Sequence, residues 1–206
     1  MLKVLYQDNH LIAVFKPAGM LTQGDITGDR CLMDEVKLYL KEKYKKPGNV
    51  FLGLLHRLDR PVSGIVLFAK TSKGASRLSE QFRNRTIEKT YHALVLGKPK
   101  ESKGNLVDFL KKNKEENAKR AELDYEVITS NNKYSLLKIN LKTGRFHQIR
   151  SQLTSLGHPI VWQDKSICLC ATSISFLPAV ALAEEGKKTI SVPVPSSWNK
   201  YLNMVN

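Results

Sequence analysis

Short β-branched and aromatic runs, separated by polar turns, recur along this chain and are the feature that most limits its fold. Residues 4–6 and 11–15 flank a polar turn and predict a strand pair, which residues 16–19 bring to an end. Residues 123–128 and 134–141 predict a second pair, split by a Ser-Asn-Asn turn signal. Further runs predict strands at 65–69, 87–96, 167–176 and 189–192.

Helical periodicity appears between these strands. Residues 32–44 repeat apolar side chains at roughly helical spacing, with lysines on the opposite face. Ser72 is expected to cap a second helix, and residues 145–156 predict a third, which ends at Gly157. A final short helix is expected after Ser196.

The remaining stretch, Lys98–Arg120, is the least apolar part of the chain, so we expect an exposed loop or insertion. There are no internal repeats and no long flexible linker. The pattern therefore predicts a single α+β domain over residues 1–206, with a mostly antiparallel mixed central sheet flanked by helices.

The charge of the chain indicates its class of partner. The 33 lysines and arginines exceed the 19 acidic residues, giving a formal charge of +14 that is spread along the whole chain. A distributed positive field attracts a polyanion, and nucleic acid is the expected one. A merely soluble basic protein is the alternative, because charge alone fixes no partner. The chain has no Gly-rich phosphate loop, so nucleotide hydrolysis has no support.

The cysteines and apolar tracts bear on location. Cys31, Cys168 and Cys170 cannot build a disulfide framework or a zinc site, and we expect reduced thiols in a cytoplasmic protein without a bound metal. The N-terminus lacks the pattern of a signal peptide. The apolar tract 174–183 is broken by Pro178 and is about half the length that crosses a bilayer. Secretion and membrane spanning are both disfavoured.

One charged loop stands out chemically. Asp59 lies between Arg57 and Arg60, ahead of the strongly apolar run 65–69. Nearby positive charge favours the ionised carboxylate, which suits a nucleophile or base better than a proton donor. A lone Asp between arginines is more often a surface ion-pair partner or a turn acceptor, so the rest of the chain must decide between these readings.

Three segments occur in a fixed order: HRLDRPVSG at 56–64, EKTYHALVLG at 88–97 and KTGRFHQIRSQLTSLGHPI at 142–160. Each alone has an ordinary explanation, such as a core tyrosine or a solvated arginine. Together they resemble the RluA-type pseudouridine synthases over residues 2–195. Because the resemblance begins at residue 2, we expect a stand-alone catalytic domain without the S4 RNA-binding module that precedes it in some relatives.

The resemblance implies a pseudouridine synthase fold and assigns catalytic roles to three residues. Asp59 matches the catalytic aspartate, which acts as a covalent nucleophile or removes the C2′ proton, and the sequence leaves both routes open. Arg150 matches the ion-pair partner of that aspartate. Tyr91 matches the tyrosine that packs against the target uracil and is a candidate to assist removal of the C5 proton. No metal or organic cofactor is implied.

The resemblance also implies how RNA is bound. The substrate would be a uridine in ribosomal or transfer RNA, flipped out of its stack, and the enzyme is expected to be a monomer. Arg57 would occupy the space that the base leaves, and Arg60 would contact phosphate. The complete set of RNA-binding candidates is His56, Arg57, Arg60, Arg145, His147 and Gln148.

The chain departs from the family pattern after Ile160. Trp162 and Gln163 precede Asp164 where the family has a Gly-Asp pair, and no Tyr-Gly follows. The structure and role of residues 162–176 are therefore open. Two rival functions remain: a catalytically silent RNA-binding or RNA-remodelling protein on the same fold, and a structural protein of the ribosome. The presence of Asp59 favours the enzyme over both.

Overall fold

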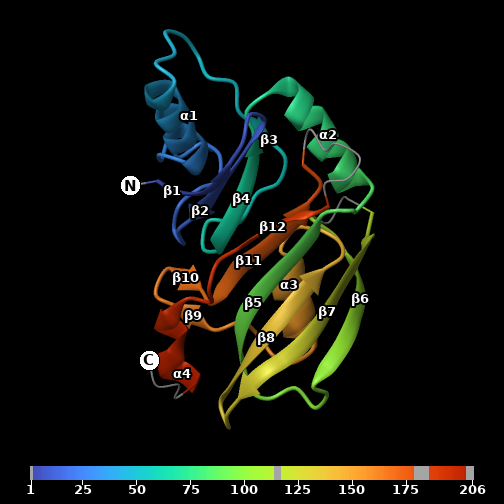
Figure 1. Cartoon of the computed structure of the whole chain (residues 1–206). Helices are drawn as coiled ribbons and strands as arrows, with labels where there is room; N and C mark the ends of the chain where they lie inside the picture. The colour runs from blue at the N-terminus through green and yellow to red at the C-terminus, as the bar shows by residue number, and fades with distance from the viewer. Residues whose placement is uncertain (1, 114–116, 179–185, 203–206) are drawn as a thin grey trace. The chain divides into compact units, whose positions relative to one another are not determined.

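The computed structural model describes residues 2–113, 117–178 and 186–202 (Figure 1). The chain forms two compact units, and each takes residues from distant parts of the sequence. Unit 1 comprises residues 1–87 and 174–192, and unit 2 comprises residues 88–173 and 193–206. Strands and helices occur in both units, which confirms the predicted α+β class. That the two units act as a single catalytic domain stays a prediction.

Unit 1 is built on a sheet whose strands follow the order β1-β2-β4-β11. The pairs β1–β2 and β2–β4 are antiparallel, β3 pairs antiparallel with β4, and β12 pairs with β11. Strands β2 and β4 are buried along nearly their whole length, which explains their continuous apolar sequences. The strands are β1 (Lys3–Gln7), β2 (Leu11–Lys16), β3 (Gly53–Leu54), β4 (Ser63–Ala69), β12 (Lys188–Ser191) and, from Ile174 on, the end of β11 (Leu169–Phe176), whose first part belongs to unit 2.

Two helices belong to unit 1, as the periodicity predicts. Helix α1 spans Leu32–Lys43, and helix α2 spans Ser72–Arg83. The prediction that Ser72 caps α2 is wrong by one residue, because the hydroxyl of Thr71 accepts the N–H of Gly74 at 3.1 Å. Thr71 has the extended backbone of an N-cap, so Ser72 is already helical.

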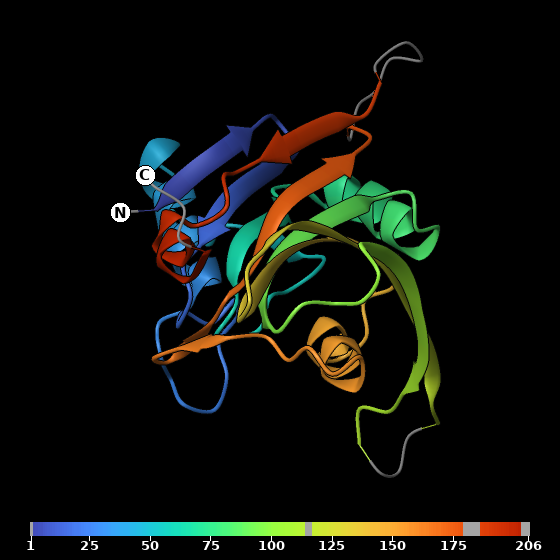
Figure 2. The same ribbon diagram turned by 90° about the horizontal axis from the view of Figure 1, so that it is seen from below.

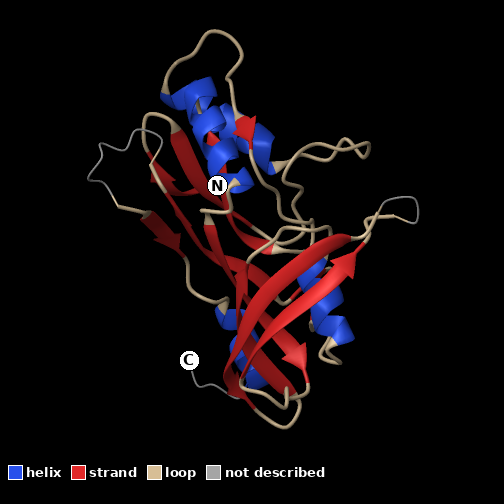
Figure 3. Cartoon of the chain, turned by 90° about the vertical axis from the view of Figure 1, so that its right-hand side faces the viewer, coloured by secondary structure: helices blue, strands red, loops and turns tan. Residues whose placement is uncertain are grey.

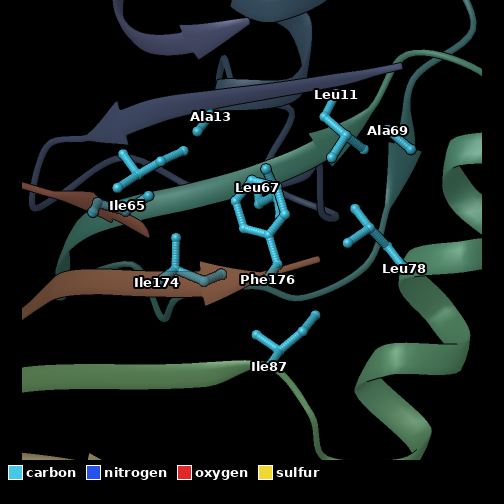
Figure 4. Close-up of a cluster of buried hydrophobic side chains, with 10 residues drawn as sticks. Leu11, Ala13, Ile65, Leu67, Ala69, Leu78, Ile87, Ile174 and Phe176 are labelled. Atoms are coloured by element: carbon cyan, nitrogen blue, oxygen red, sulfur yellow. The ribbon is translucent and has the colours of Figure 1, made fainter. Parts of the chain in front are cut away.

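The core of unit 1 brings together residues from the first half of the chain and residues from 174 to 190. Figure 4 shows Leu78 of α2 and Phe176 of β11 in one group of buried side chains with Leu67 of β4 and Ile87. Phe176 and Leu78 are both fully buried. The buried cluster consists of Leu11, Ala13, Ile65, Leu67, Ala69, Leu78, Ile87, Ile174, Phe176 and Ile190.

Unit 2 consists mainly of long strands (Figure 3) in the order β11-β5-β8-β7-β6. The pairs β5–β8, β8–β7 and β7–β6 are antiparallel. Helix α3 (Gln148–Ser155) lies inside the curve of these strands in Figure 2. The other elements are β5 (Glu88–Leu96), β6 (Lys103–Leu110), β7 (Lys119–Ser130), β8 (Tyr134–Leu141), β9 (Trp162–Gln163), β10 (Ser166–Ile167), the 3₁₀ turn Ser196–Trp198 and α4 (Asn199–Leu202).

The prediction of a loop over Lys98–Arg120 is wrong for Lys103–Leu110 and for the first two residues of β7, and residues 114–116 lie outside the described residues. Strand β6 and the beginning of β7 lie there, paired from Lys103↔Glu126 to Leu110↔Lys119. Strand β6 ends the path of the sheet and alternates exposed and half-buried residues, with Phe109 69% exposed. Lys, Gly, Asn and Asp take half of the eight positions of β6, which made this stretch resemble a loop.

The described residues contain no helix that is long and apolar enough to span a membrane. Of the apolar tract 174–183, Ile174–Phe176 lies in β11, and residues 179–183 fall outside the described residues. The three cysteines are buried, and none of them forms a disulfide within the described residues.

Candidate active site

The Asp59 loop connects β3 to β4 and is fastened on both sides of the aspartate. Before Asp59, Leu58 is buried, and its N–H donates to the hydroxyl oxygen of Thr22 at 3.2 Å, while that hydroxyl donates to the Leu58 carbonyl at 2.8 Å. After it, the N–H of Val62 donates to the Asp59 carbonyl at 3.0 Å. These contacts use the backbone and leave the half-buried Asp59 carboxylate for other contacts.

Lys16 is a member of this site that the sequence analysis missed. Its fully buried ammonium group donates to the carbonyls of Pro17 at 3.1 Å, Met20 at 2.7 Å and Arg60 at 3.2 Å. Burial lowers the pKa of Lys16 to about 8, while the negative charge of Asp59 acts in the opposite direction. Lys16 therefore anchors the loop through Arg60 and places a positive charge in the field of Asp59.

The turn after Lys16 also contacts the loop. Gly19 has φ +87°, a conformation that favours glycine, and its N–H donates to the Arg60 carbonyl at 2.8 Å. The Gly19 carbonyl accepts from Nε of Arg60 at 3.0 Å, and the same guanidinium pairs with Asp29 at 2.7 Å. Arg60, a predicted phosphate contact, thus joins the loop to this turn while remaining exposed.

Replacement of Lys16 by Met is expected to change how stability depends on pH. The pKa of Lys16 is about 8 in the folded protein against its ordinary value of 10.5, so both states carry the proton below pH 8. Between these values the unfolded chain binds more protons, and the contribution of Lys16 to the free energy of unfolding rises with pH. Urea denaturation of both proteins from pH 7 to 10 measures their free energies of unfolding. The difference between the native protein and Lys16→Met should stay constant near pH 7 and then increase in favour of the native protein as the pH rises above 8.

Lys37→Met is the control for this comparison, because Lys37 is an exposed lysine of α1 and its loss also removes one positive charge. A difference between native protein and Lys16→Met that stays constant across the whole pH range would contradict the assigned role of Lys16.

His56 and Arg57 occupy different environments at the start of the loop. Nε2 of His56 accepts the N–H of Leu67 at 3.0 Å, and the ring packs on Phe82 with centroids 5.3 Å apart. The nitrogen that accepts this bond carries no proton. His56 therefore fixes the loop to β4, whereas the side chain of Arg57 is exposed.

In unit 2, Tyr91 lies in β5 opposite Ile139 of β8 and is 7% exposed. Lys89 shares its face of the strand, since side chains alternate along β5. Burial lowers the pKa of Lys89. A Cβ placed on Gly144 would lie 3.6 Å from Nζ of Lys89, so this lysine reaches the T-G-R segment. Unit 2 thereby brings the second and third sequence motifs together.

Helix α3 begins at Gln148, three residues later than predicted, because a buried amide network holds the preceding turn. The side-chain oxygen of Gln148 accepts from the hydroxyl of Thr143 at 2.7 Å and from the N–H of Arg145 at 3.0 Å. Its side-chain nitrogen donates to the Glu122 carbonyl at 3.1 Å and to Gln152 at 2.9 Å. Gln148 is 2% exposed, so this RNA-binding candidate is occupied by internal contacts.

Gln148→Leu is expected to lower the free energy of unfolding by about 2–4 kcal/mol, because it leaves buried donors and acceptors without partners. Chemical denaturation measures this loss. Ser155→Ala, on the exposed end of α3, is the control and should change stability by less than about 0.5 kcal/mol. Equal stability of Gln148→Leu and the native protein would show that the network does not hold the helix.

The residues just before α3 carry two further candidates. His147 adopts a left-handed backbone with φ 50°, and its ring stacks on Phe146 with centroids 3.7 Å apart. Nε of Arg145 donates to the Arg120 carbonyl at 3.0 Å. Phe146 is 44% exposed, so an aromatic surface lies next to basic side chains at this end of the helix.

Arg150 follows in the first turn of α3 and is half-buried. Its guanidinium carbon lies 5.7 Å from the ring centroid of Trp162, the first residue of β9. This contact comes from the segment in which the sequence departs from the family pattern, and the sequence did not predict it. Among the described residues, no group of three or more His, Cys, Asp or Glu side chains could hold a metal ion.

Comparisons with known proteins give the family. The model of the RNA pseudouridylate synthase family matches residues 10–155, a range that contains all three catalytic candidates and all six RNA-binding candidates. The chain is 36% identical over 183 residues to tRNA pseudouridine synthase C of Vibrio cholerae, covering 78% of this chain and 72% of that protein. It is 35% identical over 173 residues to ribosomal large subunit pseudouridine synthase C of Rickettsia conorii, covering 79% of this chain and 55% of that protein.

The chain thus spans only about half the length of several curated relatives that it matches. Among solved structures, human RNA pseudouridylate synthase domain containing 4 has a TM-score of 0.79 at 22% identity, covering 99% of this chain and 95% of that one. This likeness confirms the predicted pseudouridine synthase fold. By its motifs, its fold and the family match across both units, the chain belongs to the RNA pseudouridylate synthase family.

Proposed function

We propose that this protein is an RNA pseudouridine synthase that converts uridine to pseudouridine in ribosomal or transfer RNA, with Asp59 as its catalytic carboxylate. The observation that carries the proposal is the family match over residues 10–155, which includes the Asp59 loop. The fastening of that loop by Lys16, Thr22 and Val62 supports it further, since a catalytic group must be held in place before the substrate arrives.

The proposed reaction breaks the bond between uracil N1 and ribose C1′ and rejoins the base through C5, with no net redox change. Asp59 acts as the nucleophile or removes the C2′ proton, and both routes need an ionised carboxylate. Arg150 is the proposed counter-ion of Asp59, and Tyr91 packs against the uracil. The reaction as proposed uses no metal or organic cofactor. Both units are proposed to form one catalytic domain, and the enzyme is proposed to act as a monomer in the cytoplasm.

Binding of the RNA is proposed to combine phosphate contacts with base flipping. The charge of +14 supports sequence-independent affinity, which falls as salt rises. Arg57 is exposed and is the proposed residue that fills the space of the flipped base. Arg60, Arg145 and His147 remain proposed RNA contacts. Because His56 and Gln148 are occupied by internal hydrogen bonds, we propose that they position the site instead.

The two kinds of RNA remain joint candidates, because one relative is named for transfer RNA and another for the large ribosomal subunit. The test is release of tritium from RNA labelled at uracil C5, since that hydrogen leaves when the base rejoins through C5. We expect release from a transfer RNA transcript or from 23S ribosomal RNA. Tight RNA binding without release from either would favour the catalytically silent RNA-binding protein.

A further inference from the structure

The hairpin of β9 and β10, residues 162–167, occupies the segment that departs from the family pattern. Its base is fixed to β5, because the N–H of Val161 donates to the Leu94 carbonyl at 2.9 Å. The base is closed by the N–H of Cys168, which donates to the Val161 carbonyl at 2.8 Å. Val161 and Ile167 are buried on either side of the hairpin. Trp162 therefore begins a short hairpin with a rigid base.

The ring of Trp162 contacts the cationic side chain of Arg150. The guanidinium carbon of Arg150 lies 5.7 Å from the ring centroid, within the range of a cation–π contact, and Trp is the best side chain for such a contact. Trp162 is itself 56% exposed, so its burial in a core does not explain its presence. In the ladder of β9 and β10, Trp162 pairs with Ile167 through its backbone.

We propose that Trp162 is a positioning residue that orients the guanidinium of Arg150 for the reaction; this inference rests on the proposed function. An arginine side chain has several rotatable bonds, and ordering it costs conformational entropy. Contact with a ring carried at the base of the hairpin restricts those bonds before RNA binds. A cation–π contact does not use up the five N–H donors of the guanidinium, so donors stay available for a paired contact with a carboxylate.

The kinetic test compares Trp162→Ala and Trp162→Phe under single-turnover conditions with saturating RNA. Trp162→Ala should lower the rate by about 3- to 10-fold and change the RNA dissociation constant by less than about 2-fold, given the usual strength of a cation–π contact. Trp162→Phe keeps an aromatic face and should recover most of the rate. In the Arg150→Ala background, Trp162→Ala should cause no further loss, because the residue through which it acts is gone.

A second readout needs neither RNA nor activity. The chain has two tryptophans, and Trp198 is 4% exposed, so Trp198→Phe leaves Trp162 as the sole indole. Removal of Arg150 in that background should increase acrylamide quenching of Trp162, since one face of the ring becomes uncovered. Unchanged quenching would overturn the contact itself.

The outcomes separate this inference from the proposed function. Tritium release by the native protein together with full activity of Trp162→Ala would overturn the inference alone. Additive losses in the double variant, or a loss confined to RNA affinity, would make Trp162 a base-stacking residue and also overturn it. Failure of the native protein to release tritium would reject the proposed function and the positioning role with it, even if quenching changed.

Discussion

Asp59→Asn is expected to reduce tritium release by at least about 10³-fold while leaving RNA affinity within about threefold, because an amide is neither a nucleophile nor a base at neutral pH. The substitution keeps the size of the side chain. The loop is held by hydrogen bonds to the backbone of Leu58 and Asp59, which the substitution keeps, so the fold should be retained. Single-turnover release and filter binding on one labelled RNA measure the two quantities.

Asp25→Asn is the matched control for this variant. Asp25 is an exposed aspartate of the same unit that accepts hydrogen bonds from Thr27, and an Asn oxygen can still accept them. The control should keep nearly native activity. Full activity of Asp59→Asn would reject the assigned mechanism, and equal losses of rate and affinity would make Asp59 a structural residue of the RNA surface.

Arg150→Ala is expected to lower the saturated rate by about 10²- to 10³-fold, since removing one partner of a close charge pair typically costs 2–5 kcal/mol. The affinity for RNA should fall by less than about fivefold, because one lost charge is a small part of the phosphate contacts. The expected result is therefore a rate effect much larger than the binding effect, measured as the single-turnover rate and the dissociation constant at one salt concentration.

Arg145→Ala provides the contrasting control. Arg145 lies in the same motif, and as a proposed phosphate contact it should show the reverse pattern. RNA binding should be weaker, and the slope of log binding constant against log salt concentration should become smaller by about one, while the saturated rate stays nearly native. If Arg150→Ala instead behaved like Arg145→Ala, Arg150 would be a phosphate contact, and the proposed pairing with Asp59 would be wrong.

Several parts of the fold could be predicted because they depend on local patterns. The buried strands β2 and β4 are continuous apolar runs, and helix α1 shows its periodicity and its terminating Pro47-Gly48. Strand β6 could not be recognised in the same way. Its identity depends on pairing with β7, because lysine, glycine, asparagine and aspartate interrupt its apolar residues.

In the candidate site, too, some residues can be predicted from local sequence patterns and others cannot. Asp59, Tyr91 and Arg150 are identified by short motifs, because each lies in a segment with a characteristic order of residue types. Lys16 and Trp162 have no such signal. The amine of Lys16 meets the carbonyl of Arg60, 44 positions along the chain, and Trp162 meets Arg150 only because β9 folds back beside α3. Contacts of this kind are set by tertiary structure.

The division of the chain into units has a consequence for biosynthesis. A ribosome releases residues 1–87 well before Ile174, Phe176 and Ile190, yet these late residues belong to the same buried cluster as Leu11 and Leu67. The N-terminal segment therefore emerges with a gap in its core and cannot complete its packing during the first half of translation. The two units are also poor candidates for exchange between genes, because no single junction in the chain separates one from the other.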